Sequence, residues 1–176
     1  ADQALINTFH QNLGFTLTQA QQRVIEEINQ DLGKPTPMLR LVQGDVGSGK
    51  TVVAAMAALV ALTAGHQVAL MAPTEILAEQ HNRSFADWLA PLGLTPMLLT
   101  GSMKASLKKQ HLADLESGSI RLLIGTHALF QEGVLFERLG LIIIDEQHRF
   151  GVNQRMALRD KGRNIDTTPH QLIMTA

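Results

Sequence analysis

The chain has 176 residues, and its 15 Lys and Arg, 16 Asp and Glu and 7 His give a formal net charge of −1 with histidine neutral. This length fits one ordinary domain with a hydrophobic core, and the charge excludes a strongly basic domain that attracts nucleic acid through net charge. The absence of cysteine excludes disulfides and thiolate metal sites, and the histidines lack the spacing of a zinc site.

Two helices are expected first, at Gln3–Asn12 and Thr18–Leu32, with Thr18 suited to the N-cap position. The segment 34–37, Lys-Pro-Thr-Pro, then breaks the chain. From residue 39 onward, short aliphatic runs alternate with stretches of helical length that end in glycine. The predicted strands are Leu39–Gln43, Gln67–Ala72, Pro96–Thr100, Arg121–Gly125, Leu141–Asp145 and Gln171–Thr175, and the predicted helices between them are Lys50–Ala64, Glu75–Leu89, Lys104–Glu116 and Arg149–Lys161.

Several of these strands are continuous apolar runs, of which residues 141–144, Leu-Ile-Ile-Ile, are the clearest. Such runs are typical of strands that are covered on both faces. Together with the strand–helix alternation they predict an α/β fold with a mainly parallel sheet and helices on both faces. The first residues lack a signal-peptide pattern, and the longest apolar run, 52–64, is too short to cross a bilayer, so we expect a cytosolic protein without a membrane partner.

Residues 44–51 match the phosphate-loop pattern G-x-x-x-x-G-K-[ST] in full, between an apolar strand and a helix. Glycines let successive N–H groups point at phosphate oxygens, and the following helix adds the positive end of its dipole. We expect Lys50 to neutralise the β- and γ-phosphates and the Thr51 hydroxyl to bind Mg²⁺. The candidate nucleotide-binding residues of this loop are Gly44, Asp45, Val46, Gly47, Ser48, Gly49, Lys50 and Thr51.

The apolar run 141–144 ends in Asp145, Glu146, Gln147 and His148. A buried parallel strand that ends in two acids places them at the carboxyl edge of the sheet, where ligands of open α/β sheets bind. Asp145 is then expected to hold Mg²⁺, and Glu146 to polarise the attacking water as a general base. Alone, the pair would suit a solvated strand end, but beside a complete phosphate loop the catalytic interpretation is favoured.

This combination of phosphate loop and Asp-Glu-x-His resembles the first RecA-like domain of superfamily-two helicases. Further segments match in order: 15–21 resembles the Q motif, 72–75 motif Ia, 99–102 and 125–127 the Ib and Ic elements, and 174–176 the start of motif III. Residues 43–51 and 145–152 resemble the bacterial RecG helicases. The transcription–repair coupling factors are less similar, since they typically carry Phe and Glu where this chain has Ser48 and Gln147.

The resemblance implies an ATP- and Mg²⁺-dependent DNA helicase or translocase. It would act on branched DNA such as stalled replication forks in recombination and repair, in the nucleoid region of the bacterial cytosol. It implies that Gln21 reads the adenine amino edge, that Phe15 lies near the base and that His148 works beside the acid pair. It further implies sequence-independent contacts to DNA phosphates from Thr74, Thr100, Gly101, Ser102 and Thr126. Taken singly, each Thr or Ser is better explained by helix capping, and the ordered set favours DNA contact.

The resemblance covers residues 13–176, which we expect to form the first RecA-like ATP-binding domain, cut at the start of motif III. Residues 1–12 would be a connecting helix from an upstream DNA-binding domain. A second RecA-like domain would supply arginines to the nucleotide, so this chain alone should be nearly inactive. Basic residues at 149–163 suit either a solvated helix face or contact with DNA or the second domain. Three alternatives remain open: a coupling-factor translocase, a phosphate-loop ATP-binding module that is inactive in isolation, and a phosphate-loop nucleotide switch or kinase. A GTPase would need an Asn/Thr-Lys-x-Asp guanine reader, which the sequence lacks.

Overall fold

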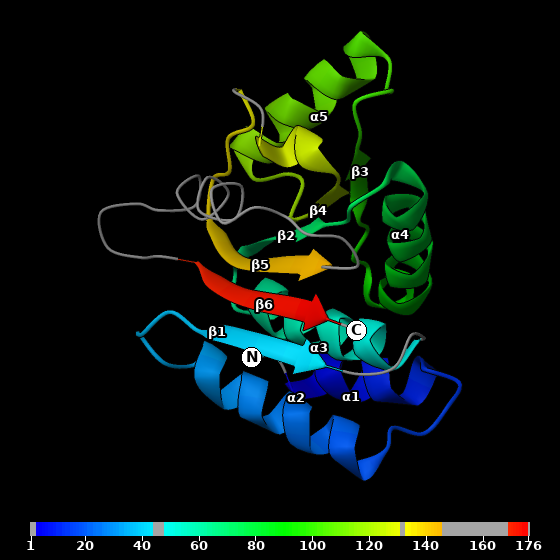
Figure 1. The fold of residues 1–176 in the computed structure, drawn as a ribbon, viewed down its shortest axis with the longest axis vertical. Helices are drawn as coiled ribbons and strands as arrows, with labels where there is room; N and C mark the ends of the chain where they lie inside the picture. Colours follow the sequence, from blue (N-terminus) through cyan, green and yellow to red (C-terminus); the bar gives the residue numbers. More distant parts are fainter. Residues whose placement is uncertain (1–2, 44–47, 131–132, 146–168, 176) are drawn as a thin grey trace.

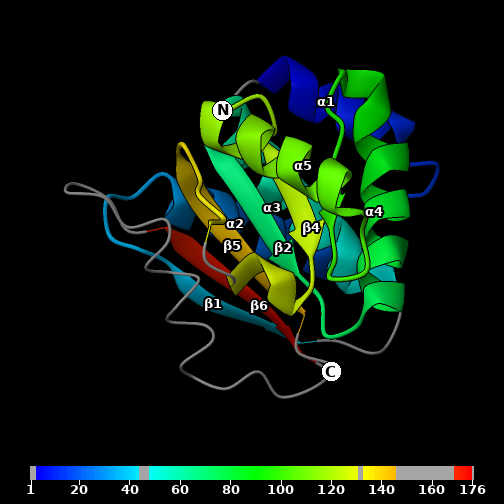
Figure 2. The same cartoon turned by 90° about the horizontal axis from the view of Figure 1, so that it is seen from above.

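The structure, a computed structural model, describes residues 3–43, 48–130, 133–145 and 169–175. Within them, one six-stranded sheet has the order β1-β6-β5-β2-β4-β3, and every neighbouring pair is parallel (Figure 1). Seen from above, the strands run side by side toward the end of the molecule where the C-terminus is marked (Figure 2). The strands are β1 (Leu39–Gln43), β2 (Gln67–Met71), β3 (Met97–Leu99), β4 (Leu122–Gly125), β5 (Leu139–Asp145) and β6 (His170–Thr175).

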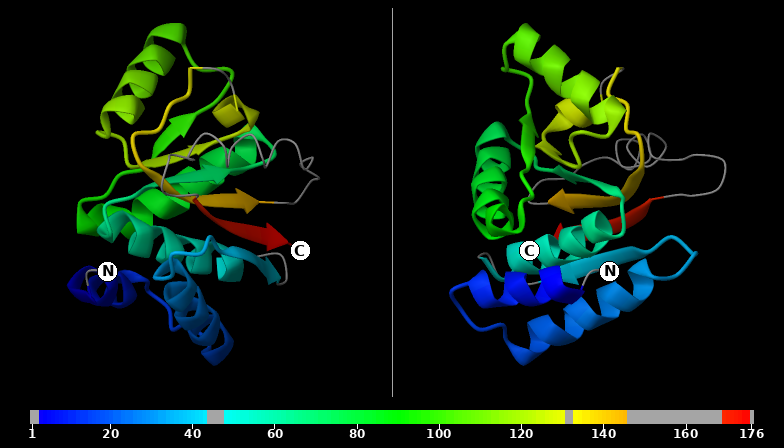
Figure 3. Two further views of the ribbon diagram at one scale, coloured as in Figure 1. Left: turned by 90° about the vertical axis from the view of Figure 1, so that its left-hand side faces the viewer. Right: turned by 180° about the vertical axis from the view of Figure 1, so that it is seen from behind.

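Helices cover the two faces of the sheet unequally. The α-helices are α1 (Gln3–Asn12), α2 (Gln19–Leu32), α3 (Ser48–Thr63), α4 (Glu75–Leu89) and α5 (Ala105–Ser117), with short 3₁₀ turns η1 (Ala90–Leu92) and η2 (His127–Phe130). One core cluster joins one face of the sheet to α1–α4, and a second joins the opposite face to α5 and η2. Figures 1 and 3 place α1 and α2 at one end of the molecule, beside β1 and α3, and α5 at the other.

The side chains of β5, one of the two central strands, show why both faces of the sheet must be covered by helices. Leu141 and Ile143 belong to the cluster with α1–α4, whereas Ile142 and Ile144 belong to the cluster with α5. Successive side chains of a strand point to opposite faces, so a run of aliphatic residues is stable only where both faces are dry. All seven residues of β5 are buried, which explains why this segment was recognisable as a parallel strand.

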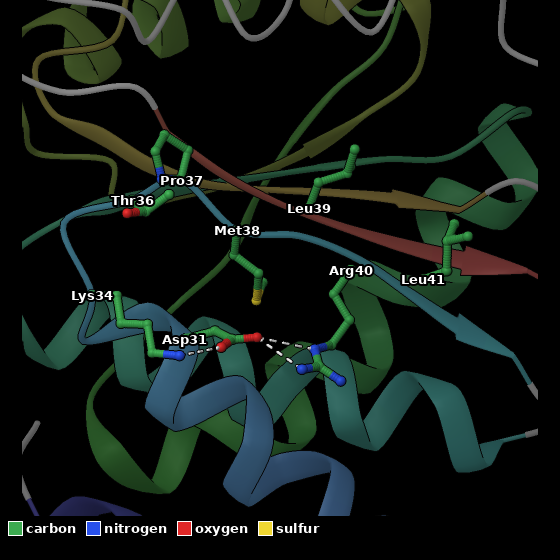
Figure 4. A pocket seen from close by; sticks show the side chains of 8 residues that line it. All are labelled: Asp31, Lys34, Thr36, Pro37, Met38, Leu39, Arg40 and Leu41. Atoms are coloured by element: carbon green, nitrogen blue, oxygen red, sulfur yellow. Dashed lines mark hydrogen bonds and ion pairs between the residues drawn. The ribbon is translucent and has the colours of Figure 1, made fainter.

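Helix α2 is fixed at both ends. At its start, Thr18 and Gln21 form a reciprocal capping box. Near its end, Asp31 accepts hydrogen bonds from the Arg40 guanidinium of β1, at 2.8 Å from Nη2, and this contact holds the pKa of Asp31 below its ordinary value. Figure 4 shows Arg40 and Lys34 on either side of Asp31, in a cavity of about 530 Å³. Its described lining residues come from the end of α2, the segment after it and the first part of β1, whereas the phosphate loop follows the carboxyl end of β1, so the cavity is no candidate for the nucleotide site.

The elements predicted from the sequence are confirmed, with small shifts at their ends. All six strands are present, and α1 and α4 have the predicted bounds. The helix after the phosphate loop begins at Ser48, earlier than expected from Lys50. Gly65, Gly93 and Gly118 follow helices with positive φ angles of 90°, 76° and 88°, which glycine adopts without a Cβ penalty. The predicted helix at 149–161 and Gly162 lie outside the described residues.

A substitution of Gly125, at the end of β4, would test how tightly the ends of the strands pack. A Cβ at this position would overlap the carbonyl oxygen of Leu99 on the neighbouring strand β3. Because that oxygen belongs to the backbone, Gly125→Ala should lower the free energy of unfolding by about 1–3 kcal/mol, the usual cost of overpacking. Gly101→Ala is the matched control, since a Cβ there meets nothing within 4 Å. Urea unfolding measures both, and equal midpoints for the two variants would contradict this packing.

Two histidines at the amino edge of the sheet predict a pH dependence of stability. Burial is the main cause that lowers the pKa of His66 and of His170 from 6.5. His170 Nδ1 also accepts a 2.7 Å hydrogen bond from the Met38 N–H, which protonation of that nitrogen would remove. The unfolded chain therefore takes up protons first as the pH falls.

The free energy of unfolding should be highest above pH 6.5, decrease as the pH falls through that value, and level off below the folded pKa values. Thermal unfolding between about pH 5 and 8 measures this. His170→Asn, which keeps an acceptor for Met38, should flatten the profile. If the pH dependence of stability were unchanged in this variant, titratable groups other than His170 would cause it.

Candidate nucleotide and DNA interface

The sites predicted from the sequence follow the carboxyl ends of parallel strands, which share one edge of the sheet. Backbone pairing sets Gln43 of β1 beside Thr175 of β6, and Asp145 of β5 beside Met174. In the other half of the sheet, Gly125 of β4 pairs with both Met71 of β2 and Leu99 of β3. The phosphate loop and acid pair thus follow β1 and β5, and the candidate DNA segments follow β2, β4 and β3.

Lys50 lies in the first turn of α3, and its Nζ donates a 2.8 Å hydrogen bond to the carbonyl oxygen of Thr175. This contact joins the helix after the phosphate loop to the end of β6, where the sequence predicts motif III. Thr51 is the next residue of the helix and is half-buried. The Thr175 hydroxyl is buried, and no hydrogen-bond partner for it is found among the described residues. Residues 44–47 and Ala176 lie outside the described part.

Asp145 ends β5 and is 3% exposed. By strand alternation it shares a face with Leu141 and Ile143, which is the face that α3 and α4 cover. Its Oδ2 lies 2.7 Å from Nε2 of His81 on α4, in a buried ion-pair geometry. The structure thus brings Asp145 and Lys50 to the same face and edge of the sheet. Glu146 and His148 lie outside the described residues.

Gln21, the candidate reader of adenine, contacts the phosphate-loop helix directly. Its Nε2 donates to the Gly49 carbonyl oxygen at 3.3 Å, while its Oε1 accepts from the Thr18 N–H at 2.9 Å. A Cβ at Gly49 would lie 3.3 Å from the Gln21 amide nitrogen, so the contact leaves little room for a larger residue. Phe15, the candidate neighbour of the base, precedes α2 and is 45% exposed.

The candidate DNA residues differ in exposure. Thr74 is exposed and caps α4, accepting from the Leu77 N–H at 3.2 Å. Gly101 and Ser102 are exposed, and Ser102 donates from both its N–H and its hydroxyl to the Glu75 carboxylate, at 3.3 and 2.9 Å. The other two residues, Thr100 and Thr126, have buried side chains, 4% and 1% exposed.

Sequence reasoning missed His81 and Glu75, although each carried a signal. His81 shares the buried stripe of α4 with Ala78, Phe85 and Leu89. A histidine at a core position of an amphipathic helix needs a polar partner, and Asp145 is that partner. Glu75 precedes an exposed hydrophobic residue, Ile76, at the start of the same helix, where an acid also favours the helix dipole.

Comparisons with known proteins agree with this geometry. The family model described as DEAD/DEAH box helicase matches residues 18–176. The ATP-dependent DNA helicase RecG of Pasteurella multocida is 57% identical over 168 residues, which are 96% of this chain and 24% of that protein. RecG of Escherichia coli K12 is 54% identical over 176 residues, 100% of this chain and 25% of that protein.

Solved structures give the same result. RecG bound to a three-way DNA junction has a TM-score of 0.86 and 43% sequence identity, over 98% of this chain and 22% of that one. The DEAD-box helicase Mss116 bound to ssRNA and UDP-BeF has a TM-score of 0.76, over 97% of this chain and 38% of that one. At 17% identity, that similarity shows the fold alone.

The chain belongs to the DEAD/DEAH box helicase family. Its similarity to RecG proteins, which the sequence motifs predicted, is confirmed over nearly its whole length. The chain spans about a quarter of the length of these relatives. None of the helices in the described part of the chain has the length and apolarity needed to cross a lipid bilayer.

Proposed function

We propose that this chain is the ATP-binding and hydrolysing motor domain of a longer RecG-type helicase, which moves on branched DNA such as stalled replication forks. The supporting observation is the placement of Lys50 and Asp145 on one face at the carboxyl edge of the sheet, in a chain 43% identical to a RecG solved on a three-way DNA junction. The same family similarity favours this function over the coupling-factor translocase and over an inactive nucleotide-binding module.

The phosphate loop, residues 44–51, would wrap the nucleotide phosphates with its backbone N–H groups. Lys50 has the neutral carbonyl of Thr175 as its partner in the structure. Phosphate oxygens would replace that carbonyl, because hydrogen bonds to a charged acceptor are about twice as strong as those to a neutral one. Gln21, which already contacts the loop at Gly49, would read the adenine edge, with Phe15 beside the base.

The donor set fits Mg²⁺, which prefers oxygen ligands and few protein carboxylates. The Asp145 carboxylate and the Thr51 hydroxyl supply such oxygens on the face that carries Lys50. Mg²⁺ there would neutralise charge on the transferring phosphoryl group. Glu146 would orient and deprotonate the attacking water, and His148 would work beside it. Both are assigned by their positions in the motif, since they lie outside the described residues.

The other half of the edge would hold one DNA strand. Thr74, Gly101 and Ser102 are exposed at the starts of helices or turns, where N–H groups and hydroxyls suit phosphate oxygens. Ser102 donates its N–H and its hydroxyl to Glu75, so it would reach a phosphate only by exchanging that carboxylate. Thr100 and Thr126 have buried side chains, so we assign them backbone contacts. A second RecA-like domain and an upstream DNA-binding domain of the same longer protein, in the bacterial cytosol, would complete the motor.

Lys50→Ala in the full-length protein should abolish ATP turnover, because the point charge that faces the β- and γ-phosphates is lost. Lys109→Ala, at an exposed position of α5, is the matched control and should keep the ATPase rate. Steady-state ATPase assays measure both. Near-normal turnover in Lys50→Ala would refute the phosphate-loop assignment.

DNA binding by the full-length protein should depend strongly on salt and little on base sequence. Each neutralised phosphate releases counterions, so the slope of log K against log salt should be about −0.9 per contact on duplex arms. Fluorescence anisotropy with two branched DNAs of the same shape and permuted sequence, at about 50 and 200 mM salt, measures both effects. A preference above about tenfold for one sequence would contradict recognition through phosphates.

A further inference from the structure

The strongest unassigned contact is the buried hydrogen bond between His81 of α4 and Asp145 of β5. Nε2 and Oδ2 are 2.7 Å apart, and the two residues are 8% and 3% exposed. They are distant in sequence, so the contact exists only because α4 packs on the face of the sheet that carries Asp145. We propose that His81 is a positioning residue, which orients the Asp145 carboxylate for Mg²⁺. This inference rests on the function proposed above.

The direction of the hydrogen bond follows from the chemistry of the acid. A carboxylate that holds Mg²⁺ is ionised and can only accept, so His81 Nε2 donates. This occupies Oδ2 and restrains the orientation of the carboxylate, so that Oδ1 would be the oxygen available to hold Mg²⁺. Carboxylate ligands of metals are commonly held by such partners, whose removal costs about 10–100-fold in metal affinity or activity.

The position of the His81 side chain is restrained, as a positioning role requires. It lies on the buried stripe of α4 between Ala78 and Phe85, so its ring is held by core packing. The start of α4 is held by the Thr74 cap and by the hydrogen bonds from Ser102 to Glu75. A carboxylate without this donor could rotate about its side-chain bonds. Fixed geometry is needed here because Mg²⁺ requires near-ideal octahedral coordination.

A closely matched control is available in the same domain. His111 of α5 is 7% exposed and contacts the Leu98 carbonyl oxygen through Nδ1 at 3.0 Å. It therefore has the burial and the single hydrogen bond of His81, but it lies on the other face of the sheet, away from Asp145. His81→Leu and His111→Leu should lower thermal stability to a similar degree. Only the first should change the requirement for Mg²⁺.

The experiment uses the full-length protein with four variants: His81→Leu, His81→Gln, His81→Asn and His111→Leu. The dissociation constant of a fluorescent ATP analogue is measured with Mg²⁺ and with EDTA, and the Mg²⁺ concentration for half-maximal ATPase is measured separately. In His81→Leu, that concentration should rise about 10–100-fold, kcat should fall, and binding in EDTA should stay unchanged. His81→Gln keeps a donor of similar reach and should restore most of the Mg²⁺ response. His81→Asn is shorter and should not.

The outcomes separate this inference from the proposed function. If His81→Leu binds Mg²⁺ and turns over like the wild type while Lys50→Ala is inactive, His81 has no positioning role and the motor assignment stands. If binding with Mg²⁺ and in EDTA weakens equally, His81 is only structural, and the inference is refuted. If His81→Leu does not fold, the comparison of Gln with Asn decides: an equal Mg²⁺ requirement in the two would overturn it. Normal ATPase activity in Lys50→Ala would instead refute the proposed function.

Discussion

Parallel strand pairing is the constraint on which every other feature of this domain depends. Parallel neighbours place all their carboxyl ends at one edge, and their hydrophobic residues require cover on both faces. The two faces of the sheet are covered by α1–α4 on one side and by α5 and η2 on the other. The polar residues that leave the strands, Lys50, Asp145, Thr74 and Ser102, therefore gather at one edge although they are far apart in the sequence.

Helix α4 belongs to both halves of this edge. Its first turn carries the Thr74 cap and the Glu75 carboxylate that holds Ser102, and its second turn carries the His81 contact to Asp145. With polar contacts at both places, the helix links the half of the edge proposed for DNA to the half proposed for the nucleotide. This also explains how a chain with a net charge of −1 can belong to a family of nucleic-acid motors. In the proposed function, donors at the strand ends would contact phosphates without a strong net positive charge.

The sequence predicted what local patterns determine. The aliphatic run 141–144 identified β5, and Thr18, as a residue suited to the N-cap, identified the start of α2. The motifs placed Lys50 and Asp145 at one edge because parallel topology was inferred first. The strand order and the His81–Asp145 contact were beyond sequence reasoning, since both depend on packing between distant segments. The β3 strand was predicted too long at both ends, because Pro96 and Thr100 continue an apolar run without pairing.

Gln21, the residue proposed to read adenine, also takes part in the capping box of α2. Gln21 has two amide hydrogens and two carbonyl lone pairs, and Gly49 and Thr18 use one of each. One N–H and one lone pair remain, which is the complement of the adenine N7 and N6 edge. A substitution at position 21 that removed the side-chain amide would leave the Thr18 N–H without its capping partner and would remove the contact to Gly49, whereas the Thr18 hydroxyl would still accept from the backbone N–H of residue 21. In the proposed function, a change of nucleotide preference at this residue would therefore also remove one of the two hydrogen bonds of the capping box and the link from α2 to α3.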